Sequence, residues 1–121
     1  MALASRLARL ELEGQALEFT ELRVLGNLAA GRNPGPQASV INLISAELYQ
    51  RAEELALQVF GHAGLQLQTE RPLYGKHARH CVHSQEALLA APRYLNGRAW
   101  SIFGGSSEIQ RNIIAQTVLG L

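Results

Sequence analysis

The chain has 121 residues, a net charge of +1 and 47% hydrophobic residues, while charged residues make up only 17%. These values indicate a single domain with a modest core and argue against nucleic acid or an anionic membrane surface as a partner. No apolar run reaches the roughly 18 residues of a membrane span, and the single cysteine, Cys81, allows no internal disulfide, so we expect a cytoplasmic protein without a membrane partner.

The first predicted helix covers about residues 2–30, a stretch without proline. Apolar residues recur there at helical spacing in two stripes, which predicts burial against more than one neighbour. One stripe contains Leu3, Leu7, Leu10, Leu17, Val24 and Leu28, and the other contains Leu12, Ala16, Phe19 and Leu22. Gly31 and the sequence NPGP at 33–36 predict the helix end, because glycine accepts a left-handed C-cap and proline cannot continue a helix.

A second helix is predicted from Gln37 to Phe60, with Gly61 at its end. Its apolar stripe is formed by Ile41, Ile44, Leu48, Ala52, Leu55 and Val59. Two long helices joined by a short turn are typical of an antiparallel hairpin within an up-and-down bundle.

The pattern is irregular from His62 to Ser84, so we expect a loop there. Ser84 is a candidate cap for a brief helix over 85–90, which we expect to end before Pro92. A further helix is predicted over 93–103 and breaks at the two glycines 104–105. The last helix begins at Ser106 or Ser107, and Ser107 with Gln110 fits a capping box. No strand pattern is found, so the predicted fold class is all-α, with one domain over 1–121.

The irregular segment contains two clusters that suggest chemistry. Four possible metal ligands crowd into seven residues, a spacing that suits neither a zinc finger nor a helical pair of histidines, so we favour a solvated loop and predict no metal. These residues are His77, His80, Cys81 and His83. A cationic group could contact the phosphates of coenzyme A, although surface charge is the default interpretation. It consists of Arg71, Lys76, His77, Arg79 and His80.

The sequence GGSSEIQR at 104–111 places two flexible glycines before a helix start. Helix starts offer unpaired N–H groups and a partial positive charge, which favour an anion or a polar ligand oxygen. Glycines allow a ligand to approach the backbone closely. By this local pattern alone, a simple joint between two helices is the commoner explanation.

The full sequence GGSSEIQRNIIAQTVLGL at 104–121 resembles the C-terminal signature of the acyl-CoA dehydrogenase family, flavoenzymes that desaturate acyl thioesters. ASVINLISAELYQRAEELALQVFGHAGLQ at 38–66 and YLNGRAWSIFGG at 94–105 are also similar to helices of that family's C-terminal domain. The resemblance implies an antiparallel up-and-down helical bundle without the helix that opens the family's domain. It also implies that FAD is the cofactor, acyl-CoA the substrate and an electron-transfer flavoprotein or a similar protein the acceptor.

The resemblance implies binding roles for residues on two helices. Gly105 matches a glycine beside the substrate thioester, and Ser106, Ser107 and Glu108 match a segment that contacts the adenosine half of the flavin. Gln58, Gly61 and His62 match a Gln-x-x-Gly-Gly pattern that reaches the adenine end of FAD in a neighbouring subunit. His62 replaces the second glycine, which puts close approach there in doubt. An ordinary glycine-capped helix end is the alternative for this second group.

No residue of the chain is a credible catalytic base. Gly104 occupies the position where one branch of the family has its catalytic glutamate, and the chain resembles the branch whose carboxylate lies on the opening helix. Glu108 is the nearest acid, but we expect the helix start to keep it ionised and solvated.

Without the opening helix, an apolar groove should lie between the two long helices and favour a homo-oligomer. Alternatives to a dehydrogenase fragment are a non-catalytic partner subunit, a relative of the flavin monooxygenases, and a free-standing helical interaction module without enzymatic activity.

Overall fold

The computed structural model of the chain describes residues 2–66 and 84–120. The described residues form helices and no strand, which confirms the predicted all-α class. The elements are α1 (Leu3–Ala29), α2 (Gln37–Phe60), the 3₁₀ segment η1 (Gly61–Leu65), α3 (Gln85–Gly97), the 3₁₀ segment η2 (Arg98–Ser101) and α4 (Ser107–Leu119). Within the described part of the chain, no helix is long and apolar enough to cross a membrane.

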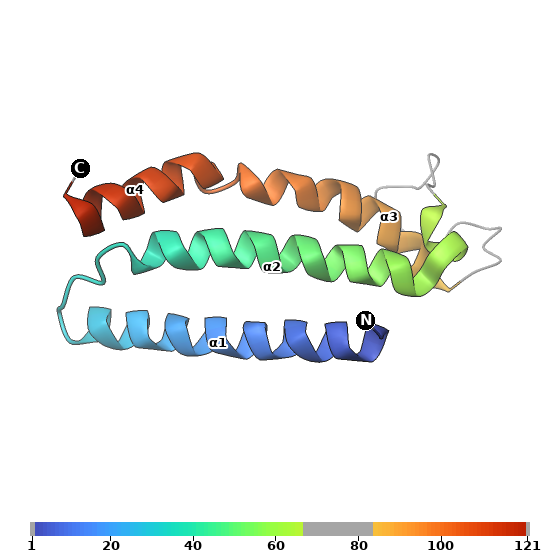
Figure 1. Ribbon diagram of the computed structural model, residues 1–121, viewed down its shortest axis with the longest axis horizontal. Coiled ribbons are helices and arrows are strands. Elements are labelled where there is room, and N and C mark those ends of the chain that lie inside the picture. Colours follow the sequence, from blue (N-terminus) through green and yellow to red (C-terminus); the bar gives the residue numbers. More distant parts are fainter. Residues whose placement is uncertain (1, 67–83, 121) are drawn as a thin grey trace.

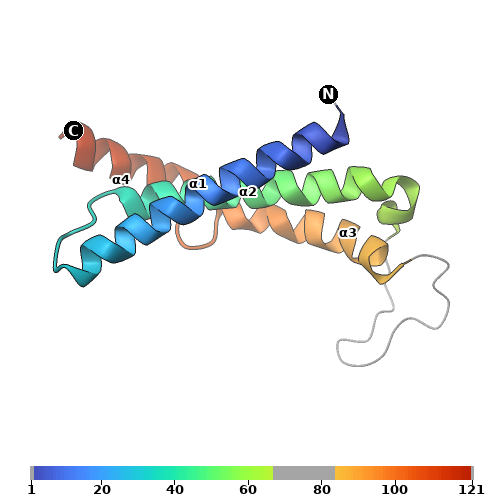
Figure 2. The same ribbon diagram turned by 90° about the horizontal axis from the view of Figure 1, so that it is seen from below.

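The central element is α2. It runs antiparallel to α1 on one side, and α3 and α4 follow one another along its other side (Figure 1). Turned by 90°, the molecule shows α1 crossing α2 at a shallow angle (Figure 2). Among the described elements, α1 packs substantially only against α2. Of the neighbours that the two predicted stripes imply, one therefore lies within the described residues.

The turn between α1 and α2 forms as the glycine and proline pattern predicts. Gly31 adopts the left-handed conformation at φ 70°, and the N–H of Arg32 donates to the carbonyl oxygen of Asn27 at 2.9 Å. This arrangement pairs a carbonyl at the helix end that would otherwise lack a partner. The Asn33 side chain then accepts from the N–H of Gly35 at 2.9 Å, which fixes the next turn of the connection.

The core of the described residues is small and rich in alanine. Its hydrophobic members, each at most 8% exposed, are Val24, Ala46, Leu55, Ala87, Ala90 and Ala91. The alanines allow α3 to approach α2 and η1 closely. The second predicted stripe of α1 faces outward instead, since Leu12, Phe19 and Leu22 are 66%, 70% and 55% exposed.

The helical segments between Ser84 and Gly104 differ from the prediction. Ser84 caps α3 by accepting from the N–H of Ala87 at 3.3 Å, as expected. However, α3 runs through Pro92 to Gly97. Proline removes one helical hydrogen bond, and the packing of the buried Ala87, Ala90 and Ala91 just before it offsets that loss. The predicted break before Pro92 is therefore wrong.

The predicted helix over 93–103 is correct only in part, because residues 93–97 continue α3 and the α-helix ends at Gly97. The chain tightens after Gly97 into η2, and the N–H groups of Ile102 and Phe103 both donate to the carbonyl of Ala99, at 2.9 and 3.0 Å. A methyl group at Gly97 would lie 3.3 Å from the Tyr49 ring, so this glycine lets the end of α3 press against α2.

Candidate functional site

The turn formed by Gly104 and Gly105 lies beside the N-terminal part of α2, next to Asn42 (Figure 1). Both residues have left-handed backbones, at φ 70° and 99°, which glycine adopts without the strain of a side chain. A Cβ atom at Gly104 would lie 2.8 Å from Nδ2 of Asn42, and one at Gly105 would lie 2.8 Å from Nε2 of Gln110. Glycine at both positions therefore satisfies the backbone conformation and the limited space together.

The side chain of Gln110 holds this turn in place. Its Nε2 donates to the carbonyl oxygen of Gly104 at 2.8 Å, and the residue is only 6% exposed. The predicted capping box is therefore wrong, because Gln110 reaches the glycine turn rather than the helix cap. Ser106 is the N-cap of α4 and accepts from the N–H of Ile109 at 3.4 Å. Ser107 is the first helical residue, and its hydroxyl donates to the carbonyl of Ser101 at 3.4 Å.

Glu108 lies in the first turn of α4 with its carboxylate in solvent. Its own backbone N–H and then the Ser106 hydroxyl donate to the carboxylate, and with a smaller contribution from Arg111 they lower the pKa of Glu108. This agrees with the expectation that Glu108 is ionised. A base that removes a proton next to a thioester needs a dry site and a pKa near the pH at which the enzyme works. Glu108 is exposed and its pKa is lowered, so it lacks the surroundings of such a base.

The carboxylate of Glu108 also decides which ligands suit the start of α4. A negative charge there already occupies the positive end of the helix, so a phosphate would be repelled. Hydroxyl groups, in contrast, can donate to the carboxylate. The turn therefore fits the ribose of a nucleotide better than its phosphates, which is compatible with the adenosine half of FAD.

A second group of expected cofactor residues lies at the other end of α2. Gly61 is exposed, has φ 53°, and has no atom within 4 Å of where its Cβ would be, so its backbone is open to a ligand. His62 is also exposed, in the first residues of η1. The Gln58 side chain accepts from Arg6 of α1 and donates to Glu54 at 3.2 Å.

The structure keeps the two groups of expected cofactor residues apart. Asn42 touches the glycine turn and Gln58 belongs to the second group, and both lie on the same unbroken helix. At 1.5 Å per residue they are about 24 Å apart along its axis. The two groups in one chain therefore cannot surround the same part of one ligand.

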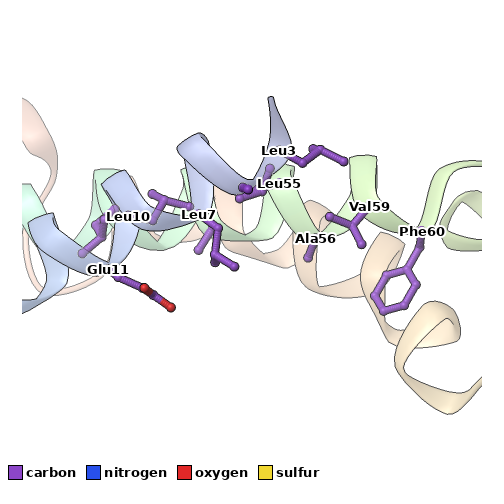
Figure 3. Close-up of a pocket in the computed structure, with 11 residues that line it drawn as sticks. Leu3, Leu7, Leu10, Glu11, Leu55, Ala56, Val59 and Phe60 are labelled. Carbon is purple, nitrogen blue, oxygen red and sulfur yellow. The ribbon is translucent and has the colours of Figure 1, made fainter. Parts of the chain in front are cut away.

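An apolar groove of about 590 Å³ lies between α1 and α2 (Figure 3). It confirms the groove predicted between the two long helices. Nearly all of its lining side chains are aliphatic or aromatic, and Glu11 is the charged member. The lining residues are Leu3, Ala4, Leu7, Leu10, Glu11, Leu48, Ala52, Leu55, Ala56, Val59 and Phe60.

Sequence reasoning missed the residues that support the glycine turn. Asn42 is one polar residue within an apolar stretch of α2, and this was the available signal for it. Next to the turn, the Trp100 ring lies between the Tyr49 ring, tilted by 45° with centroids 5.1 Å apart, and the Phe103 ring, edge-on at 6.3 Å. Burial, followed by the charge of Glu53, raises the pKa of Tyr49. Trp100 and Phe103 remain 42% and 54% exposed, so an apolar surface adjoins the turn.

The candidate metal ligands and the candidate cationic cluster of the irregular segment lie outside the described residues. They are His77, His80, Cys81 and His83, and Arg71, Lys76, His77, Arg79 and His80. Within 2–66 and 84–120, no three side chains of the metal-binding types come together.

Comparisons with known proteins agree with the resemblance in the sequence. The family model for the acyl-CoA dehydrogenase C-terminal domain matches residues 1–119. The acyl-CoA dehydrogenase IpdE1 of Mycolicibacterium smegmatis is 40% identical over 88 residues, which are 73% of this chain and 18% of that protein. IpdE1 of Mycobacterium tuberculosis is 34% identical over 109 residues, which are 85% of this chain and 24% of that protein.

A third relative aligns with the whole chain. The acyl-CoA dehydrogenase FadE34 of Mycobacterium tuberculosis is 29% identical over 121 residues, 100% of this chain and 14% of that protein. The chain thus spans a quarter or less of the length of these curated relatives. No solved structure matches.

Proposed function

Because the chain belongs to the acyl-CoA dehydrogenase family, matching its C-terminal helical domain, we propose that it forms that part of an FAD-dependent acyl-CoA dehydrogenase. The substrate of the whole enzyme is an acyl-CoA thioester, and an electron-transfer flavoprotein or a similar protein is the acceptor. FAD, when bound, takes up the hydride equivalent that leaves the acyl chain. The chain by itself is inactive, because the catalytic base is supplied from outside it.

The observation that carries this proposal is the glycine turn before α4. Gly105 presents backbone without a side chain, and we assign it to the substrate thioester. Ser106, Ser107 and Glu108 stand at the start of α4, and we assign them to the adenosine half of FAD. The ionised carboxylate of Glu108 supports contact with ribose hydroxyls, which can donate to it.

We assign Gln58, Gly61 and His62 to the FAD of a neighbouring subunit. The separation of about 24 Å along α2 from the first group supports this assignment. One chain would then contact two cofactors, and each cofactor would be held by more than one chain.

A homo-oligomer is the second part of the proposal, and the exposed surface supports it. The described residues leave large apolar side chains exposed, among them Leu7 at 52%, Phe19 at 70% and Val59 at 57%. Exposed apolar patches of this kind mark protein–protein contact sites. The aliphatic groove between α1 and α2 is the surface that we expect an oligomer to cover.

A hybrid enzyme tests the cofactor assignment. In FadE34, whose alignment covers this whole chain, the matching segment is replaced by residues 1–121, and bound FAD per protein is measured after gel filtration. We expect the hybrid to retain FAD. Glu108→Gln should weaken FAD binding about tenfold because a charged acceptor is lost, while Glu18→Gln, which neutralises an exposed acid of α1, should leave it unchanged. A folded hybrid that binds FAD equally well in both variants would contradict the assignment.

Sedimentation equilibrium of the chain at micromolar concentration tests the oligomer. We expect Leu7→Glu, in the groove, to shift the protein toward monomer. Leu119→Glu, on an exposed residue of α4, provides the control with the same change of side chain. A well-folded wild-type monomer, or equal effects of the two substitutions, would argue against this interface.

A further inference from the structure

A charged cleft of about 470 Å³ also runs along α1 and α2. It is lined by Arg6, Arg9, Leu10, Arg51 and Glu54. Helical periodicity places Arg6 and Arg9 on the side of α1 away from the apolar groove, and it does the same for Arg51 and Glu54 on α2. The contact between α1 and α2 therefore separates an aliphatic surface from a cationic one.

The carboxylate of Glu13, outside the cleft lining, is paired with two arginines of the cleft. Nε of Arg9 lies 2.9 Å from Oε1 of Glu13, and Nη1 of Arg51 lies 2.6 Å from Oε2. The hydrogen bond from Arg9 and then the contacts of Arg51 lower the pKa of Glu13. Two guanidinium groups share one carboxylate, so positive charge remains after this pairing.

Arg6 adds a charge that no carboxylate balances within the described residues. Its Nη1 donates to the side-chain oxygen of Gln58, a neutral group. The nearby carboxylate of Glu54 accepts from Nε2 of Gln58 at 3.2 Å instead. Among 2–66 and 84–120, the ion pairs of this region join Glu13 to Arg9 and Arg51 and leave Arg6 out. Each guanidinium has five N–H donors, so most of the donors of Arg6 remain available.

We propose that this cleft binds the pyrophosphate group of a nucleotide, with Arg6 as its principal contact. Planar guanidinium groups match the oxygens of phosphates by paired hydrogen bonds. The three arginines carry one positive charge more than the carboxylates of Glu13 and Glu54 can balance. The choice of FAD as the nucleotide rests on the proposed function, because Arg6 holds Gln58, which we assign to a neighbouring subunit's FAD. The cleft would bind the phosphates, which the start of α4 does not favour.

The experiment titrates the ¹⁵N-labelled chain with inorganic pyrophosphate at low ionic strength and follows the arginine Nε–H signals by NMR. We expect saturable shifts with Kd in the range of about 1 mM, because the cleft is open to water. Arg6→Gln should weaken binding about fivefold. Arg32→Gln removes one positive charge at the opposite end of α1, where Arg32 contacts Asn27, and should weaken it less than about twofold.

Separate titrations with FAD and coenzyme A identify the source of the pyrophosphate. Shifts of the same signals at lower concentrations of FAD than of coenzyme A support FAD, and the reverse order assigns the cleft to the acyl-CoA substrate. Absence of saturation by pyrophosphate at about 10 mM, or equal losses in the Arg6 and Arg32 variants at unchanged helix content, would overturn the site. Since inorganic pyrophosphate contains no flavin, that failure is distinct from loss of FAD in the hybrid enzyme.

Discussion

Replacing Gly105 by alanine tests whether the glycine turn is held by the contact with Gln110. An alanine in the left-handed conformation lowers the free energy of unfolding by about 1 to 2 kcal/mol. Alanine also reduces the entropy of the unfolded chain relative to glycine, which raises the free energy of unfolding by about 0.4 to 1 kcal/mol. At Gly31, which has φ 70° and open space around its Cβ position, these two effects act alone. We therefore expect Gly31→Ala to destabilise the chain by about 1 kcal/mol.

Gly105→Ala should cost more, because the new Cβ would lie 2.8 Å from Nε2 of Gln110. That side chain is buried and donates to the carbonyl of Gly104 at 2.8 Å, so it cannot swing away freely. Losing a buried hydrogen bond adds about 1 to 3 kcal/mol. With the left-handed strain of about 1 to 3 kcal/mol, we expect a total of about 3 kcal/mol.

Urea unfolding followed by circular dichroism at 222 nm measures both variants. The cause is checked in the Gln110→Ala background, where Gly105→Ala should cost only as much as Gly31→Ala, since the obstructing amide is gone. If the losses caused by Gly105→Ala and Gly31→Ala differ by less than about 0.5 kcal/mol in the wild-type background, the contact of Gln110 with the glycine turn does not add to the cost of the substitution.

Further predictions concern the core, the cap and the pH dependence. Leu55→Ala, in the core, should lower the free energy of unfolding by about 2 to 4 kcal/mol in urea titrations, whereas Leu12→Ala, on the exposed face of α1, should change it by less than about 0.5 kcal/mol. Ser106→Ala should lower the free energy of unfolding by about 1 kcal/mol because it removes the N-cap of α4. A larger loss for Ser107→Ala would indicate that Ser107 is the capping residue, as the sequence predicted. The pKa of Glu13 is lower in the folded chain than in the unfolded one, so its contribution is present above the unfolded pKa and is lost as the pH falls through the folded pKa. The melting temperature of Glu13→Gln should therefore fall less than that of the wild type on acidification below about pH 4.5, and parallel curves would contradict this.

The helical outline was predictable because local signals mark it. Gly31 and the NPGP sequence fixed the first turn, and Gly61 marked the end of α2. The course of the chain around Pro92 was not predictable, because buried alanines on α3 offset the missing hydrogen bond and no local pattern reveals that packing. In the same way, two stripes on α1 predicted burial against more than one neighbour, while one neighbour lies within the described residues.

The candidate site was predictable in its backbone but not in its supports. The glycines, Ser106 and Glu108 are read directly from the motif and its resemblance. Gln110 was expected to reach the helix cap, yet it bonds to Gly104, because its position six residues after that glycine has meaning only once the turn is folded. The pairing of Arg6 with Gln58 joins residues 52 positions apart, a separation at which periodicity gives no information.

Among the described elements, α1 packs substantially only against α2, and this has a consequence for local opening. Separating α1 from α2 leaves the contacts of α2 with α3 and α4 intact, so this opening requires less free energy than unfolding of the whole chain. Amide hydrogens along α1 should therefore exchange with deuterium together, and sooner than those of α2. A ligand or subunit that covers either side of the α1–α2 contact would slow this exchange. The exchange rate of the α1 amides would therefore report whether such a ligand or subunit is bound.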